Sequence, residues 1–176
     1  MTEQGRERRV VVGVSGSLGS LTALHRAAAE ARRTGAVLRA VLAWAPPGGE
    51  LGHRARPEPS VVEECRRVAG ERLLQALDDA FGPGGPDVAT KGLIIWGTPG
   101  VALVRAADGP DDLLVVGAGA RGRLHRLLHP SVARYCLAHA TCPVLAVPPS
   151  PLQDELESVR RRITWRVPVD LAELAE

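Results

Sequence analysis

The sequence predicts an α/β fold: a doubly wound, five-stranded and mostly parallel sheet with helices on both faces, followed by a C-terminal helical arm. Apolar runs rich in β-branched residues alternate with segments whose apolar residues recur at helical spacing. The runs show little alternation of polar and apolar residues, which is typical of strands covered on both faces. The chain has 176 residues, 45% of them hydrophobic and 24% charged, which suits one globular domain.

Five apolar runs are expected to form the strands of this sheet. In chain order they are RVVVGV, AVLRAVLAW, residues 88–96, DDLLVVG and CPVLAV. Because a helical segment separates each run from the next, successive strands are expected to lie parallel.

The first two helices are predicted from their apolar stripes. Residues 15–20 form a turn, and the first helix continues from it until Gly35 ends it. Ser60 and Glu63 have the spacing of a capping box, so the second helix is expected to begin there and to end at Gly82. The stripes are Leu21, Leu24, Ala27, Ala28 and Ala31, and Val61, Cys65, Val68, Leu73, Leu77 and Ala80.

Two further helices follow the third and fourth strands. Thr98 is the expected N-cap of the earlier one, with Pro99 at its first helical position. The later helix covers about residues 131–140. The expected apolar side of the earlier helix consists of Val101, Val104 and Ala107.

Prolines 148 and 149 are expected to close the α/β domain, which therefore covers residues 1–149. Residues 150–176 form an arm that is too small to fold alone. The arm begins with a short amphipathic helix whose acidic residues come early and whose basic residues come late, as the helix dipole favours.

Composition excludes several classes of protein. No apolar stretch reaches membrane length, and the N-terminus lacks the apolar segment of a secretory signal, so a cytoplasmic protein without a membrane partner is expected. Three cysteines without a C-x-x-C pair argue against a disulfide framework. A net charge of +2 and 3% aromatic residues argue against nucleic acid as a partner.

A glycine-rich loop follows the fourth strand. Gly117, Gly119 and Gly122 spell the G-x-G-x-x-G of dinucleotide-binding loops. That fingerprint belongs after the first strand and needs an acidic residue about 20 positions further on. Here it follows the fourth strand, and no Asp or Glu occurs between residues 113 and 153, so a dinucleotide site is not expected.

The chain instead resembles the universal stress protein family over roughly residues 8–148. The segments that carry the resemblance, in the family's order, are VVVGVSGS, AVLAWAPP, IIWGTPGVALVRAA, DLLVVGAGARGRLHRLLHPSV and CPVLAVP. The resemblance implies a doubly wound α/β fold and a role in stress-linked regulation or signalling.

The resemblance also implies a ligand: ATP or another adenine nucleotide, with Mg²⁺ accompanying it. Nucleotide-binding members carry Gly, two residues, Gly, nine residues, then Gly and Ser or Thr. Here Gly117 and Ser131 match, whereas Ala120 and Pro130 replace glycines, and Ser15 stands where the family tends to carry Asp. The nucleotide-binding residues expected from this carry-over are Val14, Ser15, Gly16, Ala43, Val116, Gly117, Gly119, Ala120, Arg121, Ser131 and Val132.

Two interpretations of this degenerate loop stay open. In one, the protein binds an adenine nucleotide weakly or in a changed geometry, because Pro130 removes an N–H donor. In the other, it keeps the fold, has lost the ligand, and acts through protein contacts. No catalytic residues are expected, because the loops offer no base paired with a nucleophile; a weak nucleotide hydrolase is the alternative from another class.

Two further expectations concern partners and metals. The family commonly dimerises through its final strand, so a homodimer through Pro143 to Val147 is expected, with the strand edge open to pairing. His125 and His129 have a spacing that can ligate zinc, but solvated loop histidines are the expected state, and no metal site is predicted.

Overall fold

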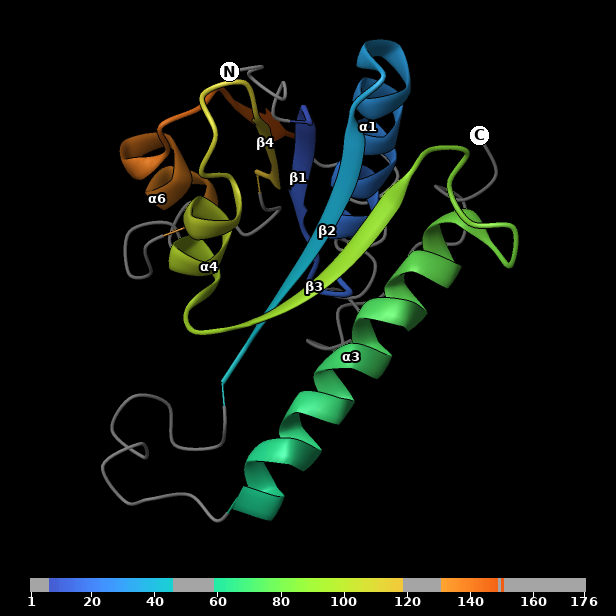
Figure 1. The fold of residues 1–176 in the computed structure, drawn as a ribbon, viewed down its shortest axis with the longest axis vertical. Helices are drawn as coiled ribbons and strands as arrows, with labels where there is room; N and C mark the ends of the chain where they lie inside the picture. The colour runs from blue at the N-terminus through green and yellow to red at the C-terminus, as the bar shows by residue number, and fades with distance from the viewer. Residues whose placement is uncertain (1–6, 46–58, 119–130, 149, 151–176) are drawn as a thin grey trace, which may run out of the picture.

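The computed structural model describes residues 7–45, 59–118, 131–148 and 150. Within them the chain alternates strands and helices in the predicted order (Figure 1). The elements are β1 (Arg9–Gly13), α1 (Leu18–Thr34), β2 (Val37–Trp44), α3 (Pro59–Phe81), β3 (Thr90–Trp96), α4 (Pro99–Ala106), β4 (Leu113–Gly117), α6 (Val132–His139) and β5 (Val144–Val147). The strands form one parallel sheet in the order β3-β2-β1-β4-β5, which confirms the predicted fold class.

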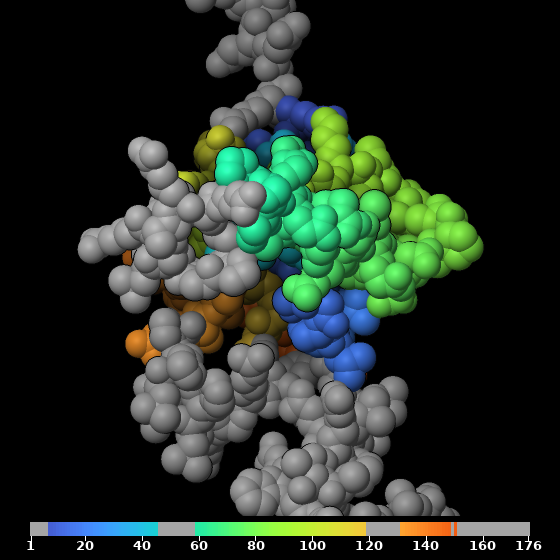
Figure 2. Space-filling model, turned by 90° about the horizontal axis from the view of Figure 1, so that it is seen from below, coloured from blue at the N-terminus to red at the C-terminus, as the bar shows by residue number. Residues whose placement is uncertain are grey.

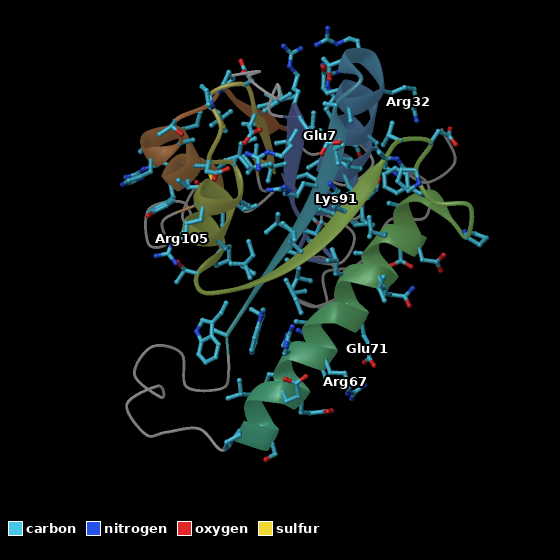
Figure 3. The ribbon with its side chains drawn as sticks, viewed as in Figure 1. Glu7, Arg32, Arg67, Glu71, Lys91 and Arg105 are labelled. Carbon is cyan, nitrogen blue, oxygen red and sulfur yellow. The ribbon has the colours of Figure 1, made fainter. Side chains whose placement is uncertain are left out.

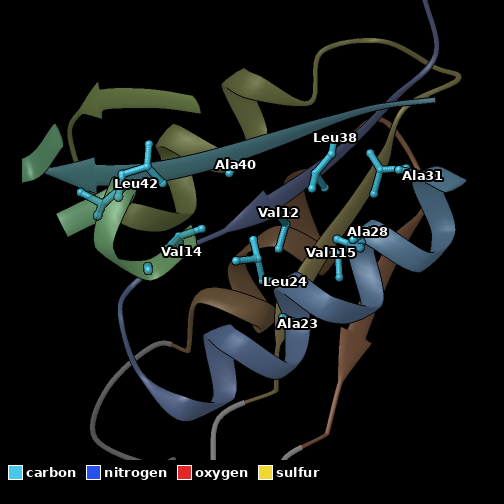
Figure 4. Close-up of a cluster of buried hydrophobic side chains, with 14 of the residues drawn as sticks. Val12, Val14, Ala23, Leu24, Ala28, Ala31, Leu38, Ala40, Leu42 and Val115 are labelled. Carbon is cyan, nitrogen blue, oxygen red and sulfur yellow. The ribbon is translucent and has the colours of Figure 1, made fainter. Parts of the chain in front are cut away.

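Helices cover the two faces of this sheet. α1 and α3 pack on one face, where Leu24, Leu38 and Val115 belong to the larger core (Figure 4). α4 and α6 pack on the other, around Leu103, Leu114 and Cys136. The strands are therefore buried from both sides, as their continuous apolar sequences predicted.

α1 begins earlier than its apolar stripe predicted. Ser17 is its N-cap, and the Ser17 side chain accepts a hydrogen bond from the Ser20 backbone N–H, so the predicted turn already belongs to the helix from Leu18 onward. Gly35 ends the helix with a φ of 64°, which confirms the predicted glycine stop.

The start of α3 differs from the prediction. The helix begins at Pro59, so Ser60 lies inside its first turn and is not the N-cap of a capping box. Val61, placed on the apolar stripe by its sequence spacing, is 42% exposed. Figure 1 shows the reason: the first turns of α3 extend beyond the end of the sheet, whereas the residues that reach it, such as Ala69 and Leu73, are buried.

The buried side of α4 was predicted only in part: Ala107 is fully buried and Val104 packs against the same core, but the small residues of the helix were missed. Gly100, Ala102, Leu103 and Ala106 are its buried residues, whereas the larger Val101 is only partly buried. α4 packs against α6, and a Cβ added at Gly100 would lie 2.6 Å from the Tyr135 ring. Small residues therefore form this contact because they let the two helices approach closely.

Arg9 forms a buried ion pair at the amino edge of the sheet, which sequence reasoning missed. Its Nε donates to Asp112 at 2.9 Å, and a second nitrogen donates to Asp108 at 2.6 Å. The Gly109 N–H also donates to Asp112. Asp112 therefore precedes β4 as an anchor, and the strand begins at Leu113 rather than at the predicted Asp111.

Surface charges also pair along the helices and between strand ends. Arg67 pairs with Glu64 and Glu71 along α3, and Lys91 of β3 pairs with Glu7 (Figure 3). The predicted arm lies outside the described residues apart from Ser150, and no helix in the described part of the chain is long and apolar enough to cross a membrane.

Candidate functional site

The candidate site lies at the carboxyl edge of the sheet. The chain winds outward from β1 through β2 to β3, then crosses to the other side of β1 and forms β4. The ends of β1 and β4 therefore meet at the topological switch point, where ligands bind in open α/β sheets. Gly13 and Gly117 are the last residues of these two strands.

The segment after β1 presents exposed polar groups at this edge. Val14 is 5% exposed, and its N–H donates to the Val41 carbonyl at 2.8 Å. Ser15 is exposed, and its hydroxyl lies 3.0 Å from the Ser17 hydroxyl. Gly16 adopts a φ of 72°, a left-handed conformation that suits glycine, and turns the chain into α1.

Gly117 has a structural role of its own. A Cβ at this position would lie 2.9 Å from the Gly19 carbonyl oxygen in the first turn of α1. The end of β4 thus packs directly on the start of α1, with Val116 buried just before it. Glycine is needed there for packing, whether or not a phosphate approaches.

Ser131 caps α6. Its side chain accepts a hydrogen bond from the Arg134 N–H at 3.1 Å, and the residue is exposed. Val132 follows as the first helical residue and is half-buried. Because α6 connects two parallel strands, its N-terminus faces the same carboxyl edge as Ser15 and Gly117.

Ala43 presents its backbone at the same edge, one strand further along. The Val41 carbonyl bonds to Val14 on the β1 side, and the Trp44 carbonyl bonds to Gly97 on the β3 side. Because backbone groups alternate between the two neighbouring strands, those of Ala43 point toward the β1 side, beyond the last residue of β1. A donor and an acceptor thus lie side by side at the switch point.

A hollow of about 460 Å³ lies between the end of β2 and the first half of α3. In the view from below, α3 occupies the middle of the surface (Figure 2). The hollow is mostly apolar, with Glu64 and Arg72 as its charged lining residues. The lining residues are Leu42, Ala43, Trp44, Ala45, Glu64, Cys65, Val68, Ala69 and Arg72.

The structure brings together Val14, Ser15, Gly16, Val116 and Gly117, with Ala43 on the neighbouring strand. Gly119, Ala120 and Arg121 lie outside the described residues, as do Pro130, His125 and His129. The described part of the chain holds no group of three or more His, Cys, Asp or Glu side chains able to hold a metal ion.

Sequence reasoning missed the hollow and Arg72. Trp44 was interpreted as a packing residue, and its ring does pack 5.1 Å from that of Trp96. A signal for Arg72 exists in the sequence: Arg66 and Arg67 have acidic residues three or four positions away on the helix, whereas Arg72 has none.

Together, fold and edge define a doubly wound α/β domain whose switch point is bordered by small and polar residues. The model of the Universal stress protein family matches residues 7–148. The chain therefore belongs to the universal stress protein family.

Several solved structures share this fold. A universal stress protein in complex with cAMP is 29% identical, with 82% of this chain and 98% of that chain covered and a TM-score of 0.53. UspA from Lactobacillus plantarum is 22% identical, with 82% and 99% covered and a TM-score of 0.61. The hypothetical protein MJ0577 is 17% identical, with 81% and 96% covered and a TM-score of 0.63. No curated protein matches the chain significantly in sequence.

Proposed function

We propose that the protein is a regulatory module of the stress response that binds an adenine nucleotide at the crevice between the ends of β1 and β4. The observation that carries the proposal is the backbone of Ala43 beside that crevice, which has no hydrogen bond on the β1 side to any residue that the structure describes. Adenine presents an amino donor next to a ring-nitrogen acceptor, so it complements a backbone carbonyl next to an N–H. The similar universal stress protein in complex with cAMP supports the same ligand class.

The phosphate side of the proposed site is weakened by the sequence. Pro130 cannot donate a hydrogen bond, and one charge-assisted bond to phosphate is worth about 1.5–3 kcal/mol. Ser15 in place of Asp removes a carboxylate that would hold a sugar hydroxyl or Mg²⁺. Because one phosphate needs fewer donors than three, we expect cAMP and AMP to bind at least as tightly as ATP.

Calorimetric titration of the full chain with cAMP, AMP and ATP, the last with and without Mg²⁺, tests this proposal. Ser15→Trp places a large side chain at the exposed mouth of the crevice and should abolish binding. Gln75→Trp, on the exposed side of α3, is the matched control and should bind as the wild type does. Equal binding by both variants would place the nucleotide elsewhere.

A protein that acts through contacts alone is the second candidate. It is favoured because both surviving motif residues have ligand-independent roles: Gly117 packs on α1, and Ser131 caps α6. Absence of heat and of thermal shift with millimolar cAMP, AMP and ATP would support this candidate. Steady release of ADP from ATP, lost in Ser15→Trp, would instead support a weak hydrolase.

We also propose a homodimer that forms through β5 in the cytoplasm, with residues 150–176 as an arm beyond the domain of residues 1–149. β5 is an edge strand. The Pro143 and Val147 carbonyls accept hydrogen bonds from Leu114 and Ala118 of the β4 side. By alternation, the backbone groups of Val144 and Ala146 point away from β4 and are available to a second copy.

A further inference from the structure

The carboxyl edge of the sheet carries large apolar side chains that are exposed to solvent. Five such side chains occur in the described part of the chain, and three of them stand at this edge. They are Leu18 at the start of α1, Val61 at the start of α3 and Trp96 at the end of β3, which are 47%, 42% and 41% exposed. Apolar side chains gathered in this way mark a surface that another segment covers.

The hollow between β2 and α3 lies at the same edge and suits one large apolar side chain. Its volume is about 460 Å³, and Trp44, Val68 and Ala69 belong to its mostly apolar lining. Trp44 is only half-buried, although the Trp96 ring packs 5.1 Å from its own. An indole or phenyl ring that entered the hollow would therefore bury itself against a fixed aromatic wall. The lining includes no residue of β1 or β4, so the hollow is not the nucleotide crevice proposed above.

The C-terminal arm of the chain contains a side chain of this kind. Residues 151–176 lie outside the described residues, and the sequence predicts that the arm begins with an amphipathic helix. Trp165, the third tryptophan of the chain, follows two residues after the last member of the apolar stripe. The stripe consists of Leu152, Leu156, Val159 and Ile163, whose spacings of four, three and four residues place them on one helix face.

The arm starts at the right edge of the sheet and has the length to reach the hollow. All strands are parallel, so the end of β5, from which the arm continues, lies at the same edge as the end of β2. Three strand spacings separate β5 from β2, which is about 14 Å. A helix over residues 152–163 is about 18 Å long. It would therefore span the edge from β5 to β2 and bring the residues that follow it to the hollow.

We propose that the arm of the same chain crosses the carboxyl edge, packs its apolar stripe over Leu18 and inserts the Trp165 indole into the hollow against Trp44. Because the arm is tethered to the domain, its docking is intramolecular and benefits from a high effective concentration. An arm on this path passes the ends of β4 and β1. Its docking therefore governs access to the switch point, whichever ligand or partner binds there.

The reactivity of Cys65 reports whether the hollow is filled. Cys65 lines the hollow and is half-buried, whereas Cys136 and Cys142 are buried, and burial raises the pKa of Cys136 to about 11. A thiol reagent at about pH 8 should therefore modify Cys65 first.

In the full chain, Trp165→Ala should speed the modification of Cys65 at least fivefold, because the reagent no longer has to displace the indole. Glu157→Ala is the matched control in the arm, since Glu157 lies opposite the apolar stripe on the predicted helix, and it should react as the wild type does. Peptide mass analysis locates the modified thiol, and circular dichroism checks that each variant folds.

A cross-linking experiment identifies the occupant directly. In the full-length Arg166→Cys variant, a short thiol-to-thiol linker should join residue 166 to Cys65 within one chain, because residue 166 adjoins Trp165. Glu157→Cys is the control and should not join to Cys65.

The proposal requires both results. It is overturned if Cys65 reacts at the same rate in the wild type and in Trp165→Ala, or if Arg166→Cys gives no link to Cys65. A linked product with the mass of two chains would place the arm in the hollow of a second copy and would also overturn the intramolecular assignment.

Discussion

Arg9 carries a guanidinium into the protein at the amino end of the central strand. The residue is 8% exposed and Asp112 is 3% exposed, so the two charges are largely removed from water. A buried ion pair adds little net stability to the folded protein, but removing one partner leaves an uncompensated buried charge. The hydrogen bonds to Asp112 and Asp108 raise the pKa of Arg9 further above its ordinary value, so the pair stays charged.

At the residue scale we therefore predict unequal effects from the two acids. Asp112→Ala should lower the free energy of unfolding by about 3–5 kcal/mol, because the buried Arg9 would keep only its bond to the more exposed Asp108, and the Gly109 N–H would lose its acceptor. Asp108→Ala removes a carboxylate whose side chain is 57% exposed and should cost less than about 1 kcal/mol. Urea denaturation measures both. Similar losses from the two variants would show that Asp112 is not the main partner.

At the scale of elements, sequence patterns predicted the order and type of every strand and helix that the structure describes. Strand starts were predicted too early: β4 was placed at Asp111 and β5 at Cys142, whereas they begin at Leu113 and Val144. Hydrophobicity marks which segments are buried. It does not mark where the ladder of backbone hydrogen bonds begins, because that depends on the neighbouring strand.

The same limit applies to helix faces and to the site. α4 buries Gly100 rather than Val101, because the contact with α6 selects small size over apolar area. Motif spacing singled out Gly117 and Ser131, since both lie at fixed distances along the chain, and their role in a binding site stays a prediction. The hollow at Trp44 and Arg72 could not be found this way, because it depends on which turn of α3 crosses the end of β2.

Two helical glycines give a matched prediction at this scale. Gly100→Ala would place a Cβ 2.6 Å from the Tyr135 ring, so α4 and α6 must separate, at a cost of about 1–3 kcal/mol. Gly70→Ala on α3 meets nothing within 4 Å and should stabilise the protein by up to about 1 kcal/mol, because alanine favours helix. The melting temperatures of the two variants, measured by thermal unfolding, test this prediction. If both variants are more stable than the wild type, the α4–α6 contact is loose.

At the scale of the whole molecule, the exposed side of β5 is the feature with the largest consequence for assembly. The strand is short, with Val144 and Leu145 half-buried and Ala146 exposed. Its inner backbone groups are occupied by β4, whereas the outer ones at Val144 and Ala146 have no strand beside them in the described sheet. A second copy that pairs there would extend the sheet.

For the homodimer proposed to form through β5, we predict that Ala146→Pro gives a monomer with an unchanged fold. Proline removes an outward N–H donor and is tolerated on edge strands, where the β4 ladder does not use that group. Ala146→Ser keeps the N–H and should remain dimeric. Light scattering coupled to size exclusion gives the mass of each. A monomeric wild type, or a dimeric Ala146→Pro, would show that the copies do not associate through this edge.

The central position of β1 has a consequence for the growing chain. β1 can pair with β2 once residues 37–44 are made, but its other side waits until residues 113–117 of β4 are made. A nascent polypeptide on the ribosome therefore carries a half-formed sheet with a bare, strongly apolar flank until residue 117 emerges. Contacts between such distant segments also slow refolding. Translation that stalls before β4 should consequently yield fragments that aggregate or recruit chaperones.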